Sequence, residues 1–386
     1  METEFIDKIP IDRNLVEQDK LDVNNRDRTN LFNWRGQFSP GLIDVLLDKF
    51  AKSNSVVFDP FVGSGTTLFE SARRSIEAYG SELNPAAVEM ASTIKFVNMP
   101  ISKRVEYITK AEEMLKKYNT NDIKHLIKET DNILIRNILV NSAINHFNIS
   151  KNKNRNGFNE AFSKHSKIIM NLPYVKKRLD VFHSDARHTE LKDNSIDLII
   201  TSPPYINVFN YHQNYRPVME KLGWDLLSIA RSEFGSNRKN RSNRFLTVVQ
   251  YSIDMNDVLK EMNRITKSNG RIIIVIGRES KIRGVSFENY KIITALACKC
   301  LSMKLLLRQE RSFKNKFGKT IYEDILHFKP QKGNYNDKHS PIQIAKHFLR
   351  EAMNDASDKS LKNDILEAVK KAEKVQPSPI FKGFVD

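Results

Sequence analysis

The sequence is poor in cysteine and contains no long apolar run. Two cysteines occur among 386 residues, Cys298 and Cys300, and a single residue separates them in an apolar stretch. Such a pair fits neither a disulfide framework nor a zinc site, and it is typical of a reducing compartment. No apolar run is long enough to span a bilayer, and the polar N-terminus predicts no signal peptide. We therefore expect a cytoplasmic protein that needs no metal.

Acidic residues are also scarce relative to basic ones. Lysine and arginine number 62 against 46 aspartates and glutamates, which gives a formal net charge of +16. The resulting pI of about 9.6 favours a polyanionic partner such as nucleic acid. The alternative is a generally basic, soluble surface. Hydrophobic residues make up 40% and charged residues 28% of the chain, as in soluble globular proteins.

Short apolar runs alternate with helical patterns along most of the chain. The runs are residues 55–59, 77–82, 180–185, 196–201, 271–277, 303–309 and 322–329. One helix is predicted to begin at Pro40, with Ser39 as its N-cap, and later helices at about 253–266 and 287–300. This alternation predicts an α/β protein with a seven-stranded, mostly parallel, doubly wound sheet.

Other stretches interrupt or flank this alternation. Residues 100–178 are predicted to form a helical insertion, which could be a DNA clamp, a recognition unit or a structural elaboration. Residues 206–250 are aromatic and basic and form the candidate DNA-contact region. The remaining divisions are an N-terminal arm (1–30), a catalytic domain (31–99 and 179–330) and a C-terminal extension (331–386). That extension reads as two amphipathic helices followed by a loose end.

A glycine loop follows the first predicted strand, in "VVFDPFVGSGTT" (56–67). It has no lysine for a phosphate-binding loop and no third glycine for the dinucleotide fingerprint. An adenosyl cofactor without phosphates, such as S-adenosylmethionine, fits better. Asp59 would suit its amino group, and Glu82, at the end of the second strand, would accept hydrogen bonds from the ribose hydroxyls.

A rigid corner, "TSPPY" (201–205), ends the fourth predicted strand. Proline has no N–H to donate, so the strand stops there. The corner presents the Ser202 hydroxyl, the carbonyl of Pro203 and the flat face of Tyr205. These groups can accept hydrogen bonds from an exocyclic amine and stack on a planar base. If the first and fourth strands are neighbours, the corner and the glycine loop face one crevice.

Together, "DPFVGSGTT" and "TSPPY" resemble the cofactor loop and the catalytic motif of the amino-methylating DNA methyltransferases. The serine-containing corner is characteristic of the cytosine-N4 group, whereas the adenine-N6 group more often has Asp or Asn there. "RGQFSPGLIDVLLDKF" (35–50) is similar to the family's motif X. The cofactor loop precedes the corner here, which departs from the commonest order of the motifs in members with a serine corner. That departure leaves the position of the target-recognition region open.

The resemblance implies a Rossmann-like class I methyltransferase fold that binds S-adenosylmethionine. It further implies methyl transfer to the N4 amine of a cytosine flipped out of double-stranded DNA, in a prokaryotic restriction–modification system. The implied catalytic residues are Ser202, Pro203, Pro204 and Tyr205. The implied cofactor residues are Phe38, Ser39, Asp59, Pro60, Phe61, Gly63, Ser64, Gly65, Thr66, Thr67, Glu82, Leu83, Asp185, Ala186 and Thr201. Among them, the resemblance places Asp185 at the cofactor adenine. The expected DNA contacts are Tyr211, Arg238, Lys239, Arg241 and Arg244.

Several alternatives stay open at this point. The same chemistry would serve adenine N6 in DNA or a base amine in RNA. A non-catalytic nucleic-acid-binding protein could also use this scaffold. Cytosine-C5 methylation needs a cysteine nucleophile, and the chain has no Pro-Cys pair and no cysteine near the corner. We see no nuclease motif, so a cognate endonuclease would be a separate chain.

Overall fold

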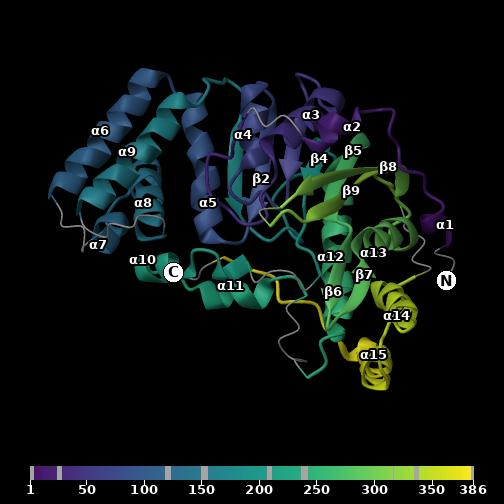
Figure 1. Cartoon of the computed structure of the whole chain (residues 1–386). Coiled ribbons are helices and arrows are strands. Elements are labelled where there is room, and N and C mark those ends of the chain that lie inside the picture. Colours follow the sequence, from purple (N-terminus) through teal and green to yellow (C-terminus); the bar gives the residue numbers. More distant parts are fainter. Residues whose placement is uncertain are drawn as a thin grey trace.

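The computed structural model describes residues 4–23, 28–117, 123–148, 155–206, 211–235, 242–315, 317–333 and 339–383. Its centre is a seven-stranded sheet with the order β3-β2-β1-β4-β5-β9-β8 (Figure 1). The strands are β1 (Val56–Asp59), β2 (Glu77–Glu82), β3 (Leu179–His183), β4 (Ile196–Thr201), β5 (Thr266–Gly277), β8 (Lys304–Lys314) and β9 (Thr320–Lys329). All seven predicted strands are present, and the predicted fold class is confirmed.

Strand direction follows the doubly wound pattern. Strands β1 to β5 pair in parallel, whereas β9 runs antiparallel to both β5 and β8. Strand β1 lies between β2 and β4, with Phe58 opposite Ile199. The strand order reverses at this point, which is where open α/β sheets bind their ligands. The predicted adjacency of the first and fourth strands is therefore confirmed.

Helices cover both faces of the sheet because its strands are apolar on both sides. Val57 and Ile273 belong to one buried cluster, with α3 (Pro40–Phe50), α4 (Thr66–Arg73) and α5 (Pro85–Ser92). Their neighbours Phe58 and Ile274 belong to the other cluster. The elements on that side are α12 (Leu246–Ile265), α13 (Asn289–Ala295), the π-helix η5 (Leu296–Cys300) and α14 (Pro341–Ala352).

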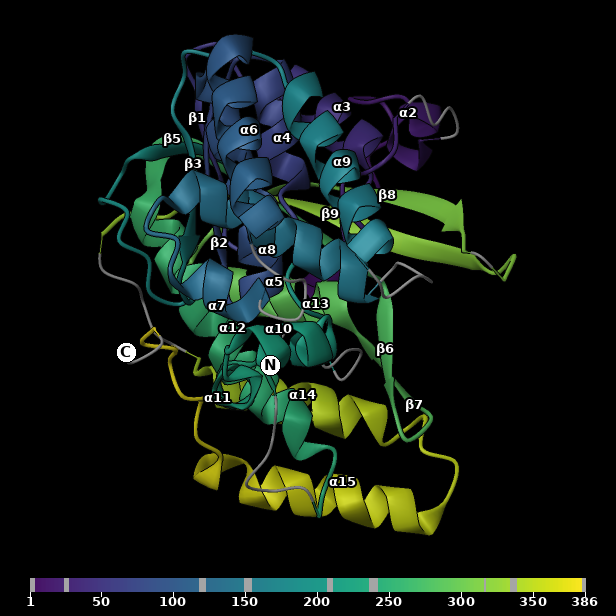
Figure 2. The ribbon, with the colours of Figure 1, turned by 90° about the vertical axis from the view of Figure 1, so that its left-hand side faces the viewer.

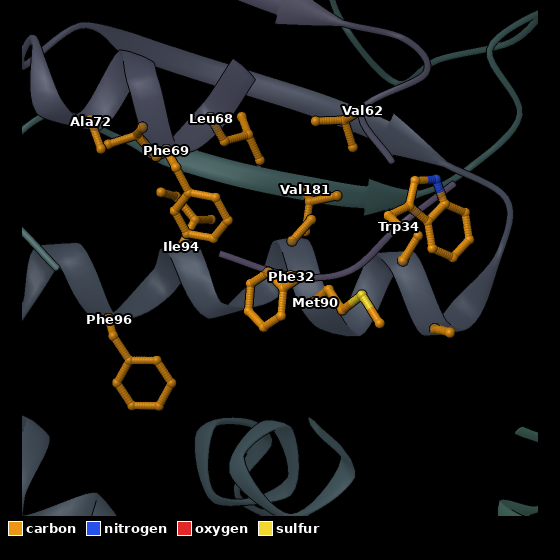
Figure 3. Close-up of a cluster of buried hydrophobic side chains, with 14 of the residues drawn as sticks. Phe32, Trp34, Val62, Leu68, Phe69, Ala72, Met90, Ile94, Phe96 and Val181 are labelled. Atoms are coloured by element: carbon orange, nitrogen blue, oxygen red, sulfur yellow. The ribbon is translucent and has the colours of Figure 1, made fainter. Parts of the chain in front are cut away.

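Part of the first buried cluster packs against the glycine loop. Figure 3 shows Phe69 of α4, Met90 of α5 and Val181 of β3 gathered between helix and strand. All three are buried. Ser39 precedes α3 as predicted, but its side chain makes no capping hydrogen bond, and Pro40 at the first turn fixes the start instead.

The segment predicted as a helical insertion contains α6 (Ile101–Lys117), α7 (Ile123–Lys128), α8 (Ile133–Asn148) and α9 (Arg155–Asn171). These helices form a group at one side of the sheet, beyond α5 (Figure 1). Arg104 of α6 is completely buried and donates to the carbonyl oxygens of Met99, Ile169, Leu172 and Pro173. A buried guanidinium with several acceptors stays satisfied without a carboxylate, so it ties both ends of this group together.

The N-terminal part of the chain packs along the sheet edge. It contains α1 (Glu4–Asp7) and α2 (Gln18–Asp22), and the backbone N–H of Asp12 donates to the carbonyl of Arg308 on β8 at 2.7 Å. The described part of the predicted arm therefore covers the outer strand.

The C-terminal extension contains α14, α15 (Lys359–Lys371) and η6 (Ala372–Lys374). Residues 375–381, expected to be loose, instead return to the sheet, where Ser378 and Phe381 are buried. Ser378 donates from N–H and hydroxyl to Asp254 at 2.8 and 2.7 Å. Backbone hydrogen bonds to a buried carboxylate have no signature in the local sequence, which explains the wrong expectation.

Several elements were not predicted. The region after the proline corner contains η3 (Tyr211–Gln213), α10 (Arg216–Leu222) and α11 (Leu226–Ser232), which lie below the carboxyl ends of the strands (Figure 1). A small hairpin of β6 (Glu279–Ile282) and β7 (Val285–Glu288) follows β5. Its turn places Arg283 and Gly284 at positive φ.

Candidate active site

A cavity of about 580 Å³ opens at the carboxyl ends of β1, β2 and β4. Its lining residues come from within segments 34–38, 60–66, 82–84, 184–186, 202–205, 211–216, 227–235 and 244–247. The cavity therefore joins the glycine loop and the proline corner in one pocket, and it is large enough for a nucleoside-sized ligand.

The glycine loop has no room for side chains. Gly63 and Gly65 have φ values of 52° and 98°, which favour glycine. A Cβ on Gly63 would lie 3.1 Å from the Trp34 ring, and one on Gly65 would lie 3.1 Å from the Cα of Ala91. The loop leads into α4, whose first residue, Thr66, lines the pocket. Its N–H groups and the helix dipole are placed for a polar ligand.

Asp59 holds the strand ends together from behind the pocket. It is 1% exposed, does not line the cavity, and accepts hydrogen bonds from the hydroxyls of Thr67 and Thr201 at 2.6 and 2.7 Å. The N–H of Phe61 donates to it at 3.0 Å. Burial raises the pKa of Asp59 to about 6, against these hydrogen bonds. Asp59, Thr67 and Thr201 therefore stabilise the glycine loop and the strand ends from outside the pocket.

Glu82 lines the pocket and binds the loop from the other side. Its carboxylate accepts the N–H groups of Gly63 at 3.0 Å and of Leu83 and Asn84 at 2.8 Å. Burial raises the pKa of Glu82 to about 7, and the nearby charge of Asp59 adds to the rise. A carboxylate at this position reaches both the glycine loop and the cavity, as expected for a residue that binds the ribose hydroxyls.

The segment that resembles motif X closes over the glycine loop. The hydroxyl of Ser64 donates to Gln37 Oε1 at 2.9 Å, and the hydroxyl of Thr66 donates to Asn30 Oδ1 at 2.9 Å. Phe38 lines the cavity, whereas Ser39 starts α3 outside its wall. Gln37 and Asn30 were not predicted, although Gln37 lies within the segment that resembles motif X and Asn30 lies shortly before it.

Residues 184–186 follow β3, where the resemblance places a contact with the cofactor adenine, and only some of them reach the pocket. Ser184 and Ala186 line the pocket. Asp185 does not. It is 1% exposed and forms an ion pair with Arg187 at 2.6 Å. The N–H of Phe381, from the C-terminal extension, also donates to Asp185 at 3.1 Å.

The remaining residues of the loop line the cavity where expected. Pro60, Phe61, Gly63 and Leu83 all contribute to its wall. Ser64 and Gly65 lie behind it, where they shape the turn. Most of the predicted cofactor residues therefore surround a single pocket, either as wall or as its direct support.

The proline corner presents Ser202, Pro204 and Tyr205 to the same pocket, with Pro203 buried behind them. The Tyr205 hydroxyl donates to Glu323 on β9 at 3.0 Å. Burial and the negative charge of Glu323 raise the pKa of Tyr205 well above its ordinary value, so the phenol stays neutral.

Two residues far away in sequence fix the position of this tyrosine. A Cβ on Gly277, at the end of β5, would lie 2.6 Å from the Tyr205 ring. Glu323 is itself paired with Arg311 at 3.0 Å. Neither Gly277 nor Glu323 was predicted, because they meet the corner only through the pairing of β4 with β5 and of β5 with β9.

The region after the corner supplies the opposite wall. Tyr211 lines the pocket, and its backbone carbonyl accepts from Asn84 Nδ2 at 3.0 Å. His212 Nδ1 lies 2.6 Å from Glu233 Oε2, and both residues face the cavity. This His–Glu pair was not predicted, since twenty residues of chain separate its partners.

Of the predicted DNA contacts, Tyr211 and Arg244 line the pocket, and Arg244 is exposed. Arg238, Lys239 and Arg241 lie outside the described residues. Tyr211 therefore sits closer to the ligand pocket than expected for a residue of a DNA-binding surface.

Other features bear on the excluded chemistries. Cys300 is buried and Cys298 half-buried in η5, and burial raises the pKa of the Cys298 thiol to about 11. Within the described ranges, no group of three or more His, Cys, Asp and Glu side chains could hold a metal ion. In the same part of the chain, no helix combines the length and apolarity that a membrane span requires.

Solved structures with a similar fold include a SAM-dependent methyltransferase from Methanosarcina mazei. It is 10% identical, with a TM-score of 0.36, and the match covers 75% of this chain and 98% of that one. Another is geranyl diphosphate C-methyltransferase from Streptomyces coelicolor, at 7% identity and a TM-score of 0.34, covering 75% of this chain and 78% of that one. Similarity at this level does not extend to the substrate.

In sequence, the chain is similar to the Type II methyltransferase M.MjaII of Methanocaldococcus jannaschii. The two are 28% identical over 105 residues, which are 26% of this chain and 19% of that protein. The match thus spans about a fifth of that relative's length. The family model described as DNA methylase matches residues 14–93 and 196–378, and so includes both the glycine loop and the proline corner. With most of its length matched in this way, the chain belongs to the DNA methylase family.

Proposed function

We propose that the chain transfers a methyl group from S-adenosylmethionine to the exocyclic N4 amine of cytosine in duplex DNA. The observation that carries this proposal is the single pocket shared by the glycine loop and the serine-containing corner. Membership of the DNA methylase family supports DNA as the substrate, and the net charge of +16 suits a polyanion.

The residues present fit the cofactor. Gly63 and Gly65 leave a cradle that side chains would fill, and Glu82 stands beside it with a carboxylate that ribose hydroxyls can reach. Phe38 and Leu83 supply apolar wall for the rest of the molecule. When bound, S-adenosylmethionine supplies an electrophilic methyl group on a positively charged sulfur.

The corner would orient the base. The target nucleotide has to leave the stack to reach a pocket of this depth. Tyr205 stacks on the flipped base, held at the correct height by its hydrogen bond to Glu323. Ser202 Oγ and the carbonyl of Pro203 accept the amine hydrogens, so that the nitrogen lone pair points at the methyl carbon. The rate comes from positioning and from stabilising the positive charge that develops on the amine.

The choice of cytosine over adenine rests on Ser202. The cytosine-N4 group characteristically has serine at this position, as the chain does. A neutral hydroxyl accepts one hydrogen bond from the amine without placing a full negative charge beside it. A restriction–modification system, with the endonuclease on a separate chain, is the setting that we propose for this activity.

Nucleoside analysis tests the proposal directly. The purified chain is incubated with S-adenosylmethionine and unmodified mixed-sequence duplex DNA, and the digested nucleosides are identified by mass, with N4-methyl and C5-methyl cytosine resolved by retention time. We expect N4-methylcytosine from the wild type and none from Ser202→Ala. N6-methyladenine would keep the chemistry and overturn the assignment of the base.

Absence of any methylated deoxynucleoside would contradict DNA methylation. RNA would then be tested as the substrate in the same assay. Binding of S-adenosylmethionine without turnover on either nucleic acid would indicate a binding protein on a methyltransferase scaffold. Calorimetric titration of S-adenosylmethionine into the Ser202→Ala variant is the control, because that substitution leaves the glycine loop untouched.

A further inference from the structure

The hairpin of β8 and β9 extends beyond the rest of the sheet. Strand β9 pairs with β5 from Phe328 to Glu323, and β5 then ends at Gly277. The hairpin continues to the pair of Lys314 and Thr320. Figure 2 shows it projecting from the body of the molecule.

The hairpin projects from the edge of the sheet that holds the pocket. Because β5 is parallel to β4, both strands end at the same edge, and Glu323 at this level contacts Tyr205. Thr320 lies three residues farther along β9, which is about 10 Å of strand. The apex of the hairpin therefore begins about 10 Å beyond the level of the residue that contacts the catalytic corner.

The apex combines a large apolar side chain with positive charge. Phe317 is 81% exposed, and Lys314 and Lys319 are exposed on either side of it. A ring with this exposure at a loop tip offers apolar area that a bound partner can bury. Lysines beside such a ring favour a polyanionic partner with apolar surface between its charges, which describes stacked bases flanked by phosphates.

Hydrogen bonds among the described residues of the turn, Asn315 and residues 317–319, can hold the ring in place. Asn315 Oδ1 accepts hydrogen bonds from the N–H groups of Phe317 at 2.9 Å and of Lys319 at 3.1 Å. The N–H of Asn315 donates to the carbonyl of Lys319 at 2.9 Å, and Gly318 has the positive φ that closes the turn. A preorganised tip loses less conformational entropy on binding than a mobile loop does.

We propose that Phe317 inserts into the base stack of duplex DNA next to the target nucleotide and holds open the space that the flipped base leaves. Lys314 and Lys319 bind the flanking phosphates. The inference rests on the proposed function, because it requires a duplex substrate from which a base is extruded. Apolar side chains inserted between base steps are a known means of offsetting the cost of unstacking.

The test compares two substrates that differ in the cost of flipping. One duplex carries the site that the wild type methylates, fully paired. The other is identical except for a mismatch opposite the target base, which lowers the cost of extrusion. We expect Phe317→Ala to slow single-turnover methylation of the paired duplex on the order of tenfold to a hundredfold. On the mismatched duplex, its rate should return to that of the wild type.

Leu306→Ala is the matched control, since Leu306 is 37% exposed on β8 at the opposite end of the hairpin. We expect it to leave both rates unchanged. The double variant Lys314→Gln/Lys319→Gln should reduce the slope of log affinity against log salt by about two, because each lysine neutralises about one phosphate.

Three outcomes would overturn the proposed insertion of Phe317, the wedge. Equal rates for Phe317→Ala and the wild type on the paired duplex would show that the ring is not inserted. Equal losses on paired and mismatched duplexes would assign it a binding contact without a role in flipping. A change in sedimentation with both rates intact would assign the apex to a second copy of the chain. If the wild type methylates neither duplex, the proposed function fails instead of the wedge.

Discussion

Replacing Gly277 by alanine should disable the catalytic corner without unfolding the protein. The backbone of Gly277 does not have a positive φ, so alanine fits its conformation. The added Cβ would lie 2.6 Å from Cε2, 3.1 Å from Cδ2 and 3.3 Å from Cζ of Tyr205. Carbon atoms in contact are separated by about 3.5 to 4.0 Å, so the ring has to move by about 1 Å.

A displacement of this size is large for catalysis and small for stability. A misplacement of about 1 Å can cost about a hundredfold in rate, and we expect that loss in kcat. Overpacking costs about 1 to 3 kcal/mol of folding free energy, offset in part by the lower backbone entropy of alanine in the unfolded chain. The variant should therefore remain folded and bind S-adenosylmethionine normally, because Gly277 does not line the pocket.

The assay measures transfer of a labelled methyl group to DNA, together with calorimetric titration of the cofactor and urea unfolding. Gly41→Ala is the control, because its Cβ would also lie 2.6 Å from a side chain, that of Val23, which is not part of the pocket. Gly41→Ala should retain its activity. Wild-type kcat in Gly277→Ala would refute the assignment of Tyr205 as the residue that positions the base.

Two further predictions concern the pocket. Burial raises the pKa of Glu82 from 4.5 to about 7, so the folded protein holds a proton between these values that the unfolded chain has lost. The stability contributed by Glu82 therefore falls by about 3 kcal/mol as the pH rises through that window. Glu82→Gln should gain on the wild type by this amount between pH 5 and 8 in urea unfolding without cofactor, and a constant difference would contradict it. Tyr205→Phe, which keeps the ring and loses the hydrogen bond to Glu323, should lower kcat about tenfold, whereas Tyr205→Ala should lower it at least as much as Gly277→Ala. Equal kcat for the two Tyr205 variants would show that the ring does not stack on the base.

The fold could be predicted from the sequence because its strands are short, apolar and separated by clear helical patterns. Hydrophobic periodicity is a local signal, and it also gave the adjacency of β1 and β4 through the doubly wound order. The β6–β7 hairpin was missed because "ESKIRGVSFE" follows β5 at once and each of its two strands has only four residues. Its turn depends on the positive φ of Arg283, which a sequence pattern does not predict.

The wall of the candidate pocket was predictable where its residues lie within one motif. Gly63, Glu82 and Ser202 line the pocket as the motifs indicated. Asp59 was placed in the right loop, but its burial behind the wall depends on Thr201, far away along the chain. Supporting residues such as Glu323 could not be found, because long-range strand pairing brings them to the corner.

The sequence and the structure indicate different roles for Asp185: a contact with the cofactor adenine and a buried ion pair with Arg187. The Asp185→Asn variant tests which role it has. An ionised carboxylate offers about four lone-pair sites. Oδ1 accepts the N–H and Nε of Arg187 at 3.0 and 2.9 Å, and Oδ2 accepts Arg187 Nη2 at 2.6 Å and the N–H of Phe381 at 3.1 Å. All four sites are thus used, so adenine could bind to Asp185 only by displacing one of these donors. Asp185→Asn removes the closest partner of the buried guanidinium, which keeps its ion pair with Asp254 at 3.2 Å. We therefore expect a cost of about 3 kcal/mol in urea unfolding, the low end of the range for breaking a buried ion pair. The affinity for S-adenosylmethionine, measured on the folded variant, should change less than threefold, which corresponds to about 0.6 kcal/mol. A loss of cofactor affinity at unchanged stability would instead assign Asp185 to the adenine, and the Arg187 pair would then have to open when the cofactor binds.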